Sequence, residues 1–363
     1  MNNKKITFKE IAQAAGLSVA SVSRAIHKPH LTSSKTQERV NLAIKQLNYH
    51  TKNAFKAPTE RNQSKKLLVI DNQLFSNSLI NKGIDSKAKQ LGYKLLYLRF
   101  LHFSEHEIQQ MISYTINHRV DGILLINDSP YLDQLLPFSH ALPPIVLVNN
   151  FSVEFPCVYF DHLSLAYQAT EHLLSIGHKK IGIVLSNSNK LSNFYLEQGY
   201  LQALSRYDVL VDKRYIIHNC GRYRQAKSAI KQLFNQPNPP SALVCTDNLC
   251  LNYMDEDKSF SSATITSSNE MIYGVLNQCR DLRLNLPKQL SVLYFSHHKT
   301  NMLHHELNHF STLYKPLFLM GEQSVELLLT ILQPNDYAEK FKLIEGELIV
   351  RHSILQIPYY DQG

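Results

Sequence analysis

The sequence has few of the features that mark several large classes of protein. Glycine accounts for only 12 of its 363 residues, and neither the phosphate-loop pattern G-x-x-x-x-G-K nor the nucleophile pattern G-x-S-x-G occurs. No run of about 18 apolar residues is present, so we predict no membrane span. The polar N-terminal residues lead directly into a helical pattern, which argues against a signal peptide.

Cysteine is also scarce, and its pattern suits neither disulfides nor zinc. Cys245 and Cys250 have no second pair at metal-binding spacing. The cysteines are odd in number and lie in or near apolar runs, which is typical of buried free thiols in a reducing cytoplasm. The five are Cys157, Cys220, Cys245, Cys250 and Cys279.

Acidic residues are nearly absent from the first 66 positions. That segment holds 13 Lys and Arg against 3 Asp and Glu, a net charge of +10, whereas the remainder holds 25 against 27, a net charge of −2. The whole chain's charge of +8 therefore lies there. A basic excess this local indicates a surface that binds nucleic-acid phosphates.

The same basic segment has the pattern of a helix-turn-helix. Thr7 and the glutamate three residues later have the spacing of a reciprocal helix cap, and residues 8–15 place apolar side chains on one face. Gly16 suits the left-handed turn that ends this helix. Short helices over 19–27 and about 35–48 would complete a small core. The alternative is a three-helix bundle that touches no nucleic acid, but the charge favours DNA binding.

The helix over 19–27 would present small and hydroxylated side chains together with one arginine. Small side chains let the backbone approach phosphates, and Arg24 can form two hydrogen bonds to a guanine edge.

The run ITFKEIAQAAGLSVASVSRAI, followed by TSSKTQERVNLAIKQLNY, resembles the headpiece of the lactose-repressor-type transcription regulators. Later segments, among them FDHLSLAYQATEHLLSIGHKKIGIV and LNLPKQLSVL, resemble the cytidine-responsive members of that family. The resemblance covers nearly the whole chain. It implies a cytoplasmic, nucleoid-associated repressor that is not an enzyme, needs no cofactor or metal, and binds double-stranded operator DNA as a homodimer. It further implies control of nucleoside uptake and catabolism genes, cytidine or another nucleoside as effector, and the cyclic-AMP receptor protein as a co-bound partner.

Carried over position by position, the resemblance also implies a set of DNA-binding residues. Those expected to hold phosphates are Ser18, Ser21, Ser23 and Thr36, and those expected to face bases are Val19, Ala20, Arg24 and His27. Thr7, Ser33 and Tyr49 complete the predicted set.

The connector over residues 50–66 is polar and basic, without an apolar period. The family has a short hinge helix here, and one of its leucines inserts into the DNA minor groove. Pro58 stands where that leucine is expected, and proline disrupts a helix interior. We therefore predict a flexible tether in place of a minor-groove wedge.

From Leu67 onward, short apolar runs alternate with amphipathic segments of helical period. Strands separated by helices form parallel sheets, and two such series predict two lobes. The predicted fold class is thus an N-terminal all-α helix-turn-helix headpiece followed by an α/β two-lobe core, the periplasmic-binding-protein-like plan that the resemblance also implies. Predicted strands are 67–71, 94–100, 122–127, 145–149, 158–161, 180–185, 214–218, 242–245 and 291–295, and predicted helices include 76–91, 105–118, 192–206, 223–235 and 269–282.

The predicted domains follow from these series and from two expected returns of the chain between the lobes. They are a headpiece over 1–49, a linker over 50–66, a first lobe over 67–161 plus about 298–316, and a second lobe over 162–297 plus about 317–363.

Ligands of such cores bind outside the carboxyl ends of the strands, between the lobes. The resemblance implies that Asp161 and Tyr223 hold ligand-binding positions, but the family's arginine and aspartate are replaced by Leu196 and Ser296. The loop after the first strand is shorter than in the family and keeps one aromatic residue, Phe75. At a position where the family has an acidic residue, this chain has Asn269. The predicted effector set is Phe75, Asp161, Leu196, Tyr223, Asn269 and Ser296.

Loss of an arginine and an aspartate removes the strongest charge-assisted hydrogen bonds of such a site. Two interpretations stay open. Substitute donors, or the inserted segment over about 246–265, would restore nucleoside binding. Alternatively, the core binds no small effector and acts through dimerisation and a protein partner.

A competing motif lies late in the chain. Residues 305–309 read HELNH, which fits the zinc-peptidase pattern His-Glu-x-x-His. No helical apolar period supports the segment and no third ligand is evident, so a metal-dependent hydrolase is the remote alternative. We expect this stretch to be a surface loop.

Overall fold

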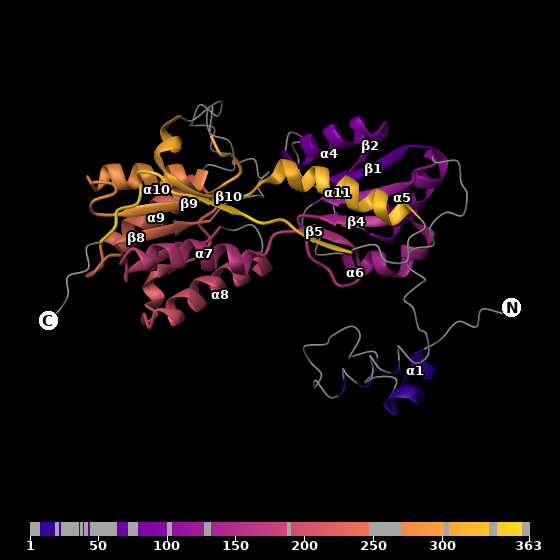
Figure 1. Cartoon of the computed structure of the whole chain (residues 1–363), viewed down its shortest axis with the longest axis horizontal. Coiled ribbons are helices and arrows are strands. Elements are labelled where there is room, and N and C mark those ends of the chain that lie inside the picture. The colour runs from indigo at the N-terminus through magenta and orange to yellow at the C-terminus, as the bar shows by residue number, and fades with distance from the viewer. Residues whose placement is uncertain are drawn as a thin grey trace.

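The computed structural model describes residues 8–18, 22, 36, 39, 43, 64–71, 79–99, 104–126, 132–186, 190–246, 270–300, 305–333 and 340–357. Figure 1 shows two lobes side by side, with α1 (Phe8–Ala15) below the first of them. Among the residues just given, no helix is long and apolar enough to cross a membrane.

The first helix has the ends that the sequence predicts. α1 covers Phe8–Ala15, and Gly16 follows with a φ of 60°, in the left-handed region that glycine adopts without strain. The amide of Leu17 donates to the carbonyl of Ala12 at 2.9 Å, which closes the last turn. Buried small side chains from three segments form the local core, namely Ala12, Ala15, Val22 and Ala43.

The first lobe is built on a parallel sheet in the order β11-β5-β4-β3-β1-β2. Its central strands read as continuous apolar runs because helices cover both faces. The strands are β1 (Lys66–Asp71), β2 (Lys94–Leu98), β3 (Gly122–Ile126), β4 (Ile145–Val148), β5 (Cys157–Tyr159) and β11 (Phe341–Leu343). The helices are α4 (Leu79–Gln90), α5 (Glu105–His118), α6 (Leu132–Leu135), the 3-10 helix η2 (Leu136–Ala141) and α11 (Leu317–Leu332).

The second lobe has a sheet in the order β12-β10-β9-β8-β6-β7, parallel except for the β10–β12 pair. Its strands are β6 (Ile181–Val184), β7 (Ile216–Ile217), β8 (Ala242–Cys245), β9 (Ser291–Ser296), β10 (Ser311–Tyr314) and β12 (Glu347–Ile349). The helices are α7 (His162–Ser175), α8 (Lys190–Arg206), α9 (Tyr223–Phe234) and α10 (Glu270–Asp281), with 3-10 helices η3 (Lys213–Tyr215) and η5 (His305–His309).

Two of the predicted domain boundaries are wrong, because the chain returns to the first lobe later than expected. β10 pairs with β9, so residues 311–314 belong to the second lobe and not to the first. The return takes place at Lys315–Pro316, and α11 then packs on α4 and β4 of the first lobe. β11 pairs with β5 in the first lobe and β12 with β10 in the second, so the last crossing lies at 344–346.

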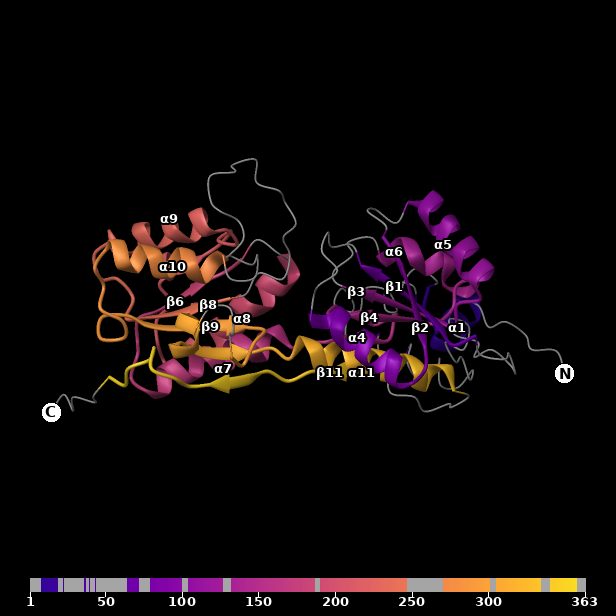
Figure 2. The same ribbon diagram turned by 90° about the horizontal axis from the view of Figure 1, so that it is seen from above.

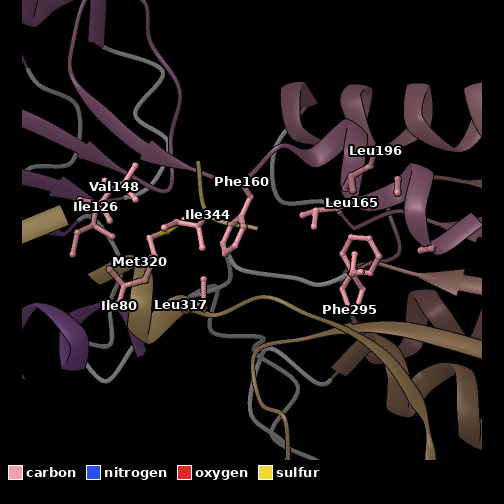
Figure 3. Close-up of a cluster of buried hydrophobic side chains, with 14 of the residues drawn as sticks. Ile80, Ile126, Val148, Phe160, Leu165, Leu196, Phe295, Leu317, Met320 and Ile344 are labelled. Atoms are coloured by element: carbon pink, nitrogen blue, oxygen red, sulfur yellow. The ribbon is translucent and has the colours of Figure 1, made fainter. Parts of the chain in front are cut away.

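One hydrophobic cluster runs through both lobes and the crossings between them. Figure 3 shows Ile126 and Met320 in the first lobe, Phe160 and Ile344 at the crossings, and Leu165 in the second lobe. Each crossing contributes a buried side chain, namely Phe160, Lys315 and Ile344, so the lobes share one core. Separate clusters fill the outer half of each lobe.

The cysteines described are free and buried, as predicted: Cys157, Cys220, Cys245 and Cys279. Burial raises the pKa of the Cys220 thiol to about 11 and that of Cys279 to about 12. Thiols with such pKa values are protonated at neutral pH and chemically inert.

Candidate DNA interface and effector site

Two of the eleven predicted DNA-binding residues lie in the described part of the chain. Ser18 is exposed, and its carbonyl accepts from the amide of Val22, four residues later, at 3.0 Å, which is the spacing of a helical bond. Thr36 is half-buried in a helix. Arg39 donates from Nη2 to the carbonyl of Gly16 at 3.1 Å and so fixes the third segment against the turn. The other nine residues lie outside the described residues: Thr7, Val19, Ala20, Ser21, Ser23, Arg24, His27, Ser33 and Tyr49.

The linker reaches the core at a defined anchor. The carboxylate of Asp121 accepts from the amides of Ser64 and Lys66, each at 3.2 Å, and the Ser64 hydroxyl donates to the carbonyl of Arg119. Lys66 Nζ donates to the carbonyl of His118 at 3.0 Å. The tether therefore leaves the first lobe from a fixed point beside the start of β1 and β3.

The two lobes turn the carboxyl ends of their strands toward each other. β5 ends at Tyr159 and the chain passes directly into α7 of the second lobe. β10 ends at Tyr314 and leads through Lys315 into α11 of the first lobe. Figure 1 shows the segments that join the lobes, and Figure 2 shows the two lobes and α11 from above. We call the region formed by the facing strand ends and the crossings the interlobe junction, and it is where parallel α/β sheets bind ligands.

Asp161, at this junction, acts as a helix cap. Its Oδ1 accepts from the amides of Leu163 and Ser164, each at 3.1 Å, and its Oδ2 accepts from the Ser164 hydroxyl at 2.7 Å. A carboxylate at a helix N-terminus satisfies free amides and suits the helix dipole. Asp161 is therefore committed to starting α7.

Leu196 contradicts its predicted place in an effector site. It is 3% exposed and belongs to the shared core, where Figure 3 shows it beside Leu165 and near Phe295. α8 packs on α7 at this point so closely that a Cβ on Gly199 would lie 2.1 Å from the carbonyl oxygen of Leu163. The position is thus inside the α7–α8 interface and offers no surface to a ligand.

Ser296 and Tyr223 are likewise engaged within the second lobe. The Ser296 hydroxyl donates to the carbonyl of His298 at 2.9 Å and accepts from its amide at 3.2 Å, which fixes the turn after β9. The Tyr223 hydroxyl accepts from Asn277 Nδ2 at 2.9 Å, between α9 and α10. Phe75 and Asn269 lie outside the described residues.

Three basic residues at the junction belong to no binding pattern that the sequence shows. Lys315 is fully buried, with Nζ 4.9 Å from the centroid of the Phe160 ring. His298 follows β9, and desolvation lowers its pKa, with His297 and Lys82 lowering it further. Lys82 is on α4 of the first lobe, whereas Lys315 and Phe160 lie on the two crossings. No local pattern could have paired residues so distant in sequence.

The histidine-rich motif lies at the surface, as expected, with His305 and His309 exposed, but it forms the short 3-10 helix η5 in place of a loop. Leu307 is 1% exposed and anchors it, and the Tyr273 hydroxyl donates to Glu306 Oε1 at 2.6 Å. A zinc-peptidase motif needs an α-helix that puts both histidines on one face. Among the described residues, no group of three or more His, Cys, Asp or Glu is placed to hold a metal ion.

Comparison with known protein families gives matches along most of the chain. Residues 7–52 match the model of bacterial regulatory proteins of the lacI family, residues 67–250 that of periplasmic binding proteins and sugar binding domain of LacI family, and residues 170–354 that of periplasmic binding protein-like domains. These matches confirm the predicted helix-turn-helix headpiece and two-lobe core.

Similar proteins of full length are transcription regulators. The HTH-type transcriptional repressor CytR of Escherichia coli K12 is 29% identical over 97% of both chains. The repressor PurR of Haemophilus influenzae is 24% identical over 97% of this chain and 99% of its own. A CelR–cellobiose complex has the same fold, with a TM-score of 0.62, 20% identity and coverage of 96% of this chain and 100% of that one. A sugar-binding transcriptional regulator of the LacI family from Escherichia coli, complexed with phosphate, has a TM-score of 0.65 and 18% identity. The match covers 82% of this chain and 100% of that one.

Proposed function

We propose a function from one premise: this chain belongs to the LacI family of bacterial regulatory proteins. It is a DNA-binding transcription regulator, and its relatives are regulators, not enzymes. Within that class we infer a repressor of nucleoside uptake and catabolism genes, acting as a homodimer at the nucleoid in the cytoplasm, with cytidine or another nucleoside as effector. The cyclic-AMP receptor protein is the proposed co-bound partner.

The observation that carries this proposal is the similarity to CytR over 97% of both chains. Similarity of that extent includes the headpiece, the tether and both lobes, so it covers the parts that read DNA and the parts that sense a ligand. The net charge of +10 in residues 1–66 supports phosphate binding by the headpiece.

Two features of the structure support a route from effector binding to DNA binding. The lobes are joined at three crossings, and the headpiece tether is fixed to the first lobe through Asp121. A ligand that binds both strand edges changes the angle between the lobes. In a homodimer this would move the two tether anchors relative to each other and alter how both headpieces fit their half-sites.

A second candidate keeps DNA binding but removes the small effector. The burial of Leu196 favours it, because the position at which the family has a charged anchor is closed. Ser296 is held in its own turn, which removes the second anchor. Regulation would then depend on a protein partner or on the amount of the regulator.

Genome-wide mapping of bound DNA, with and without added cytidine, tests the proposal. We expect binding upstream of nucleoside uptake and catabolism genes, and loss of occupancy when cytidine is added. Occupancy of those genes that does not respond to any nucleoside would support the second candidate. Binding at unrelated genes would refute the nucleoside assignment.

A further inference from the structure

Cationic side chains gather at the amino edge of the first sheet, where the chain enters β1. Lys65 directly precedes β1, and its carbonyl accepts from the amide of Lys94, the first residue of β2, at 2.7 Å. Ser64 donates from its hydroxyl to the carbonyl of Arg119, which lies between α5 and β3. α4 follows β1 and runs back to the same edge, with Lys89 in its last turn. We call these four cations the basic edge: Lys65, Lys89, Lys94 and Arg119.

The charges of the basic edge are open to solvent. All four residues are exposed. None of them forms a salt bridge with another residue in the described ranges. The carboxylate of Asp121 lies beside them, but it already accepts from the amides of Ser64 and Lys66. The basic edge therefore presents a net positive charge at neutral pH.

A local explanation exists for only half of this group. Lys89 and Arg119 lie at the C-terminal ends of α4 and α5, where a cation suits the helix dipole. Lys65 and Lys94 lie at the starts of strands, where no such dipole acts. The cluster is also unusual for its surroundings, because residues 67–363 hold 25 Lys and Arg against 27 Asp and Glu.

The basic edge lies at the end of the core from which the headpiece is tethered. The tether joins the first lobe through Ser64 and Lys66, next to these cations. Because the carboxyl ends of the two sheets face each other, the amino edge of the second sheet is at the opposite end of the core. Figure 1 shows α1 of the headpiece below the first lobe. A coil as long as the tether spans about 20–25 Å, so DNA held by the headpiece comes within reach of the basic edge.

We propose that the basic edge binds the phosphate backbone of DNA beside the half-site, as a contact of the core that is separate from the headpiece. Duplex DNA offers the complementary charge at high density, about one phosphate per 1.7 Å of helix axis. Lysine and arginine contacts to phosphate carry no base information, so this contact adds affinity on any flanking sequence. It also orients the first lobe over the DNA.

Fluorescence anisotropy of the full-length protein with duplex DNA tests the proposal. Each duplex carries one site from the genome-wide map, with flanks of either about 5 or about 15 base pairs on each side, titrated over a range of salt concentrations. The longer flanks should tighten binding by the wild-type protein. They should also steepen the fall of log K with log salt concentration, because more counterions are released.

Lys94→Gln and Arg119→Gln should each lower the magnitude of this slope by about 1 on the long duplex and leave binding to the short duplex unchanged. Lys94→Arg keeps the charge and should keep the wild-type slope. Lys288→Gln is the matched control, since it removes the same charge from an exposed lysine before β9, at the amino edge of the second sheet. It should behave as wild type on both duplexes. Both side chains at the basic edge are exposed, so the urea unfolding midpoint should not change in either variant.

Equal wild-type affinity for the two duplexes would overturn the inference and leave the headpiece as the DNA-binding part. Slopes on the long duplex that stay at the wild-type value in both Lys94→Gln and Arg119→Gln would also overturn it. An equal loss in Lys288→Gln would mean that the overall charge of the protein attracts DNA and that the basic edge makes no contact. A loss confined to the long duplex and to the two variants at the basic edge is the result that supports the proposal.

Discussion

Replacing Leu196 by arginine, the residue type that the family has at this position, is expected to destabilise the second lobe and not to create an effector contact. Leu196 is 3% exposed and lies in the core shared by α7 and α8. Truncation to alanine should lower the free energy of unfolding by about 2–5 kcal/mol, because it removes buried methyl groups and leaves a cavity. Arginine should cost at least as much, because it adds a charge for which the surrounding apolar side chains offer no partner.

The assay is urea unfolding followed by far-UV circular dichroism, which reports the helices directly in a protein without tryptophan. Leu191→Ala is the matched control: Leu191 is on the same helix but 55% exposed, so its truncation should change the free energy of unfolding by less than about 0.5 kcal/mol. Wild-type stability of Leu196→Arg together with tighter binding of any nucleoside would refute the reasoning. Position 196 would then face a ligand and not the core.

Three further predictions concern DNA reading, the tether and pH. Arg24→Ala should weaken specific DNA binding by about 1–3 kcal/mol and relax the preference at one base pair, whereas Lys35→Ala should weaken binding to all sequences alike. Equal losses of affinity for specific and random DNA in Arg24→Ala would contradict the role assigned to this arginine. As a flexible coil, the polar tether of about 17 residues has an end-to-end distance of some 20–25 Å. DNA binding should therefore tolerate one or two base pairs inserted between the half-sites. Loss of binding to such DNA in a mobility-shift assay would exclude a flexible tether. Burial lowers the pKa of His178, whose ring bonds to Ser241 Oγ at 2.9 Å and to the carbonyl of Leu355 at 3.0 Å. The unfolded chain therefore binds more protons, so the free energy of unfolding should fall as pH drops below about 6.5. His178→Gln should weaken this dependence of the free energy of unfolding on pH. A free energy of unfolding that rises on acidification would contradict the prediction.

Local patterns in the sequence determined where several of the helices begin and end. Ser104 and Glu107 form the reciprocal cap that starts α5, with the Ser104 amide donating to Glu107 Oε2 at 2.9 Å, and the helix covers the predicted Glu105–His118. Gly16 ends α1 as expected. These features depend on contacts within a few residues, and so local sequence contains all the information that they require.

The sequence also determined the division of charge. A net charge of +10 in the first 66 residues is a property of composition alone. It predicts the nucleic-acid-binding end of the chain whatever the details of the fold. The match of residues 7–52 to the lacI-family headpiece agrees with it.

Only the tertiary structure decided which lobe each late segment joins and which side chains meet between the lobes. Strand β10 was assigned to the wrong lobe because a short apolar strand carries no information about its neighbour in a sheet. A leucine at position 196 could face either a core or an open site, and the sequence does not distinguish the two. The packing of α7 on α8 places it in the core. Lys315 lies over the Phe160 ring only because the crossing that enters α11 passes beside the crossing that leads from β5 to α7. Such contacts join residues far apart in the chain, so no local pattern encodes them.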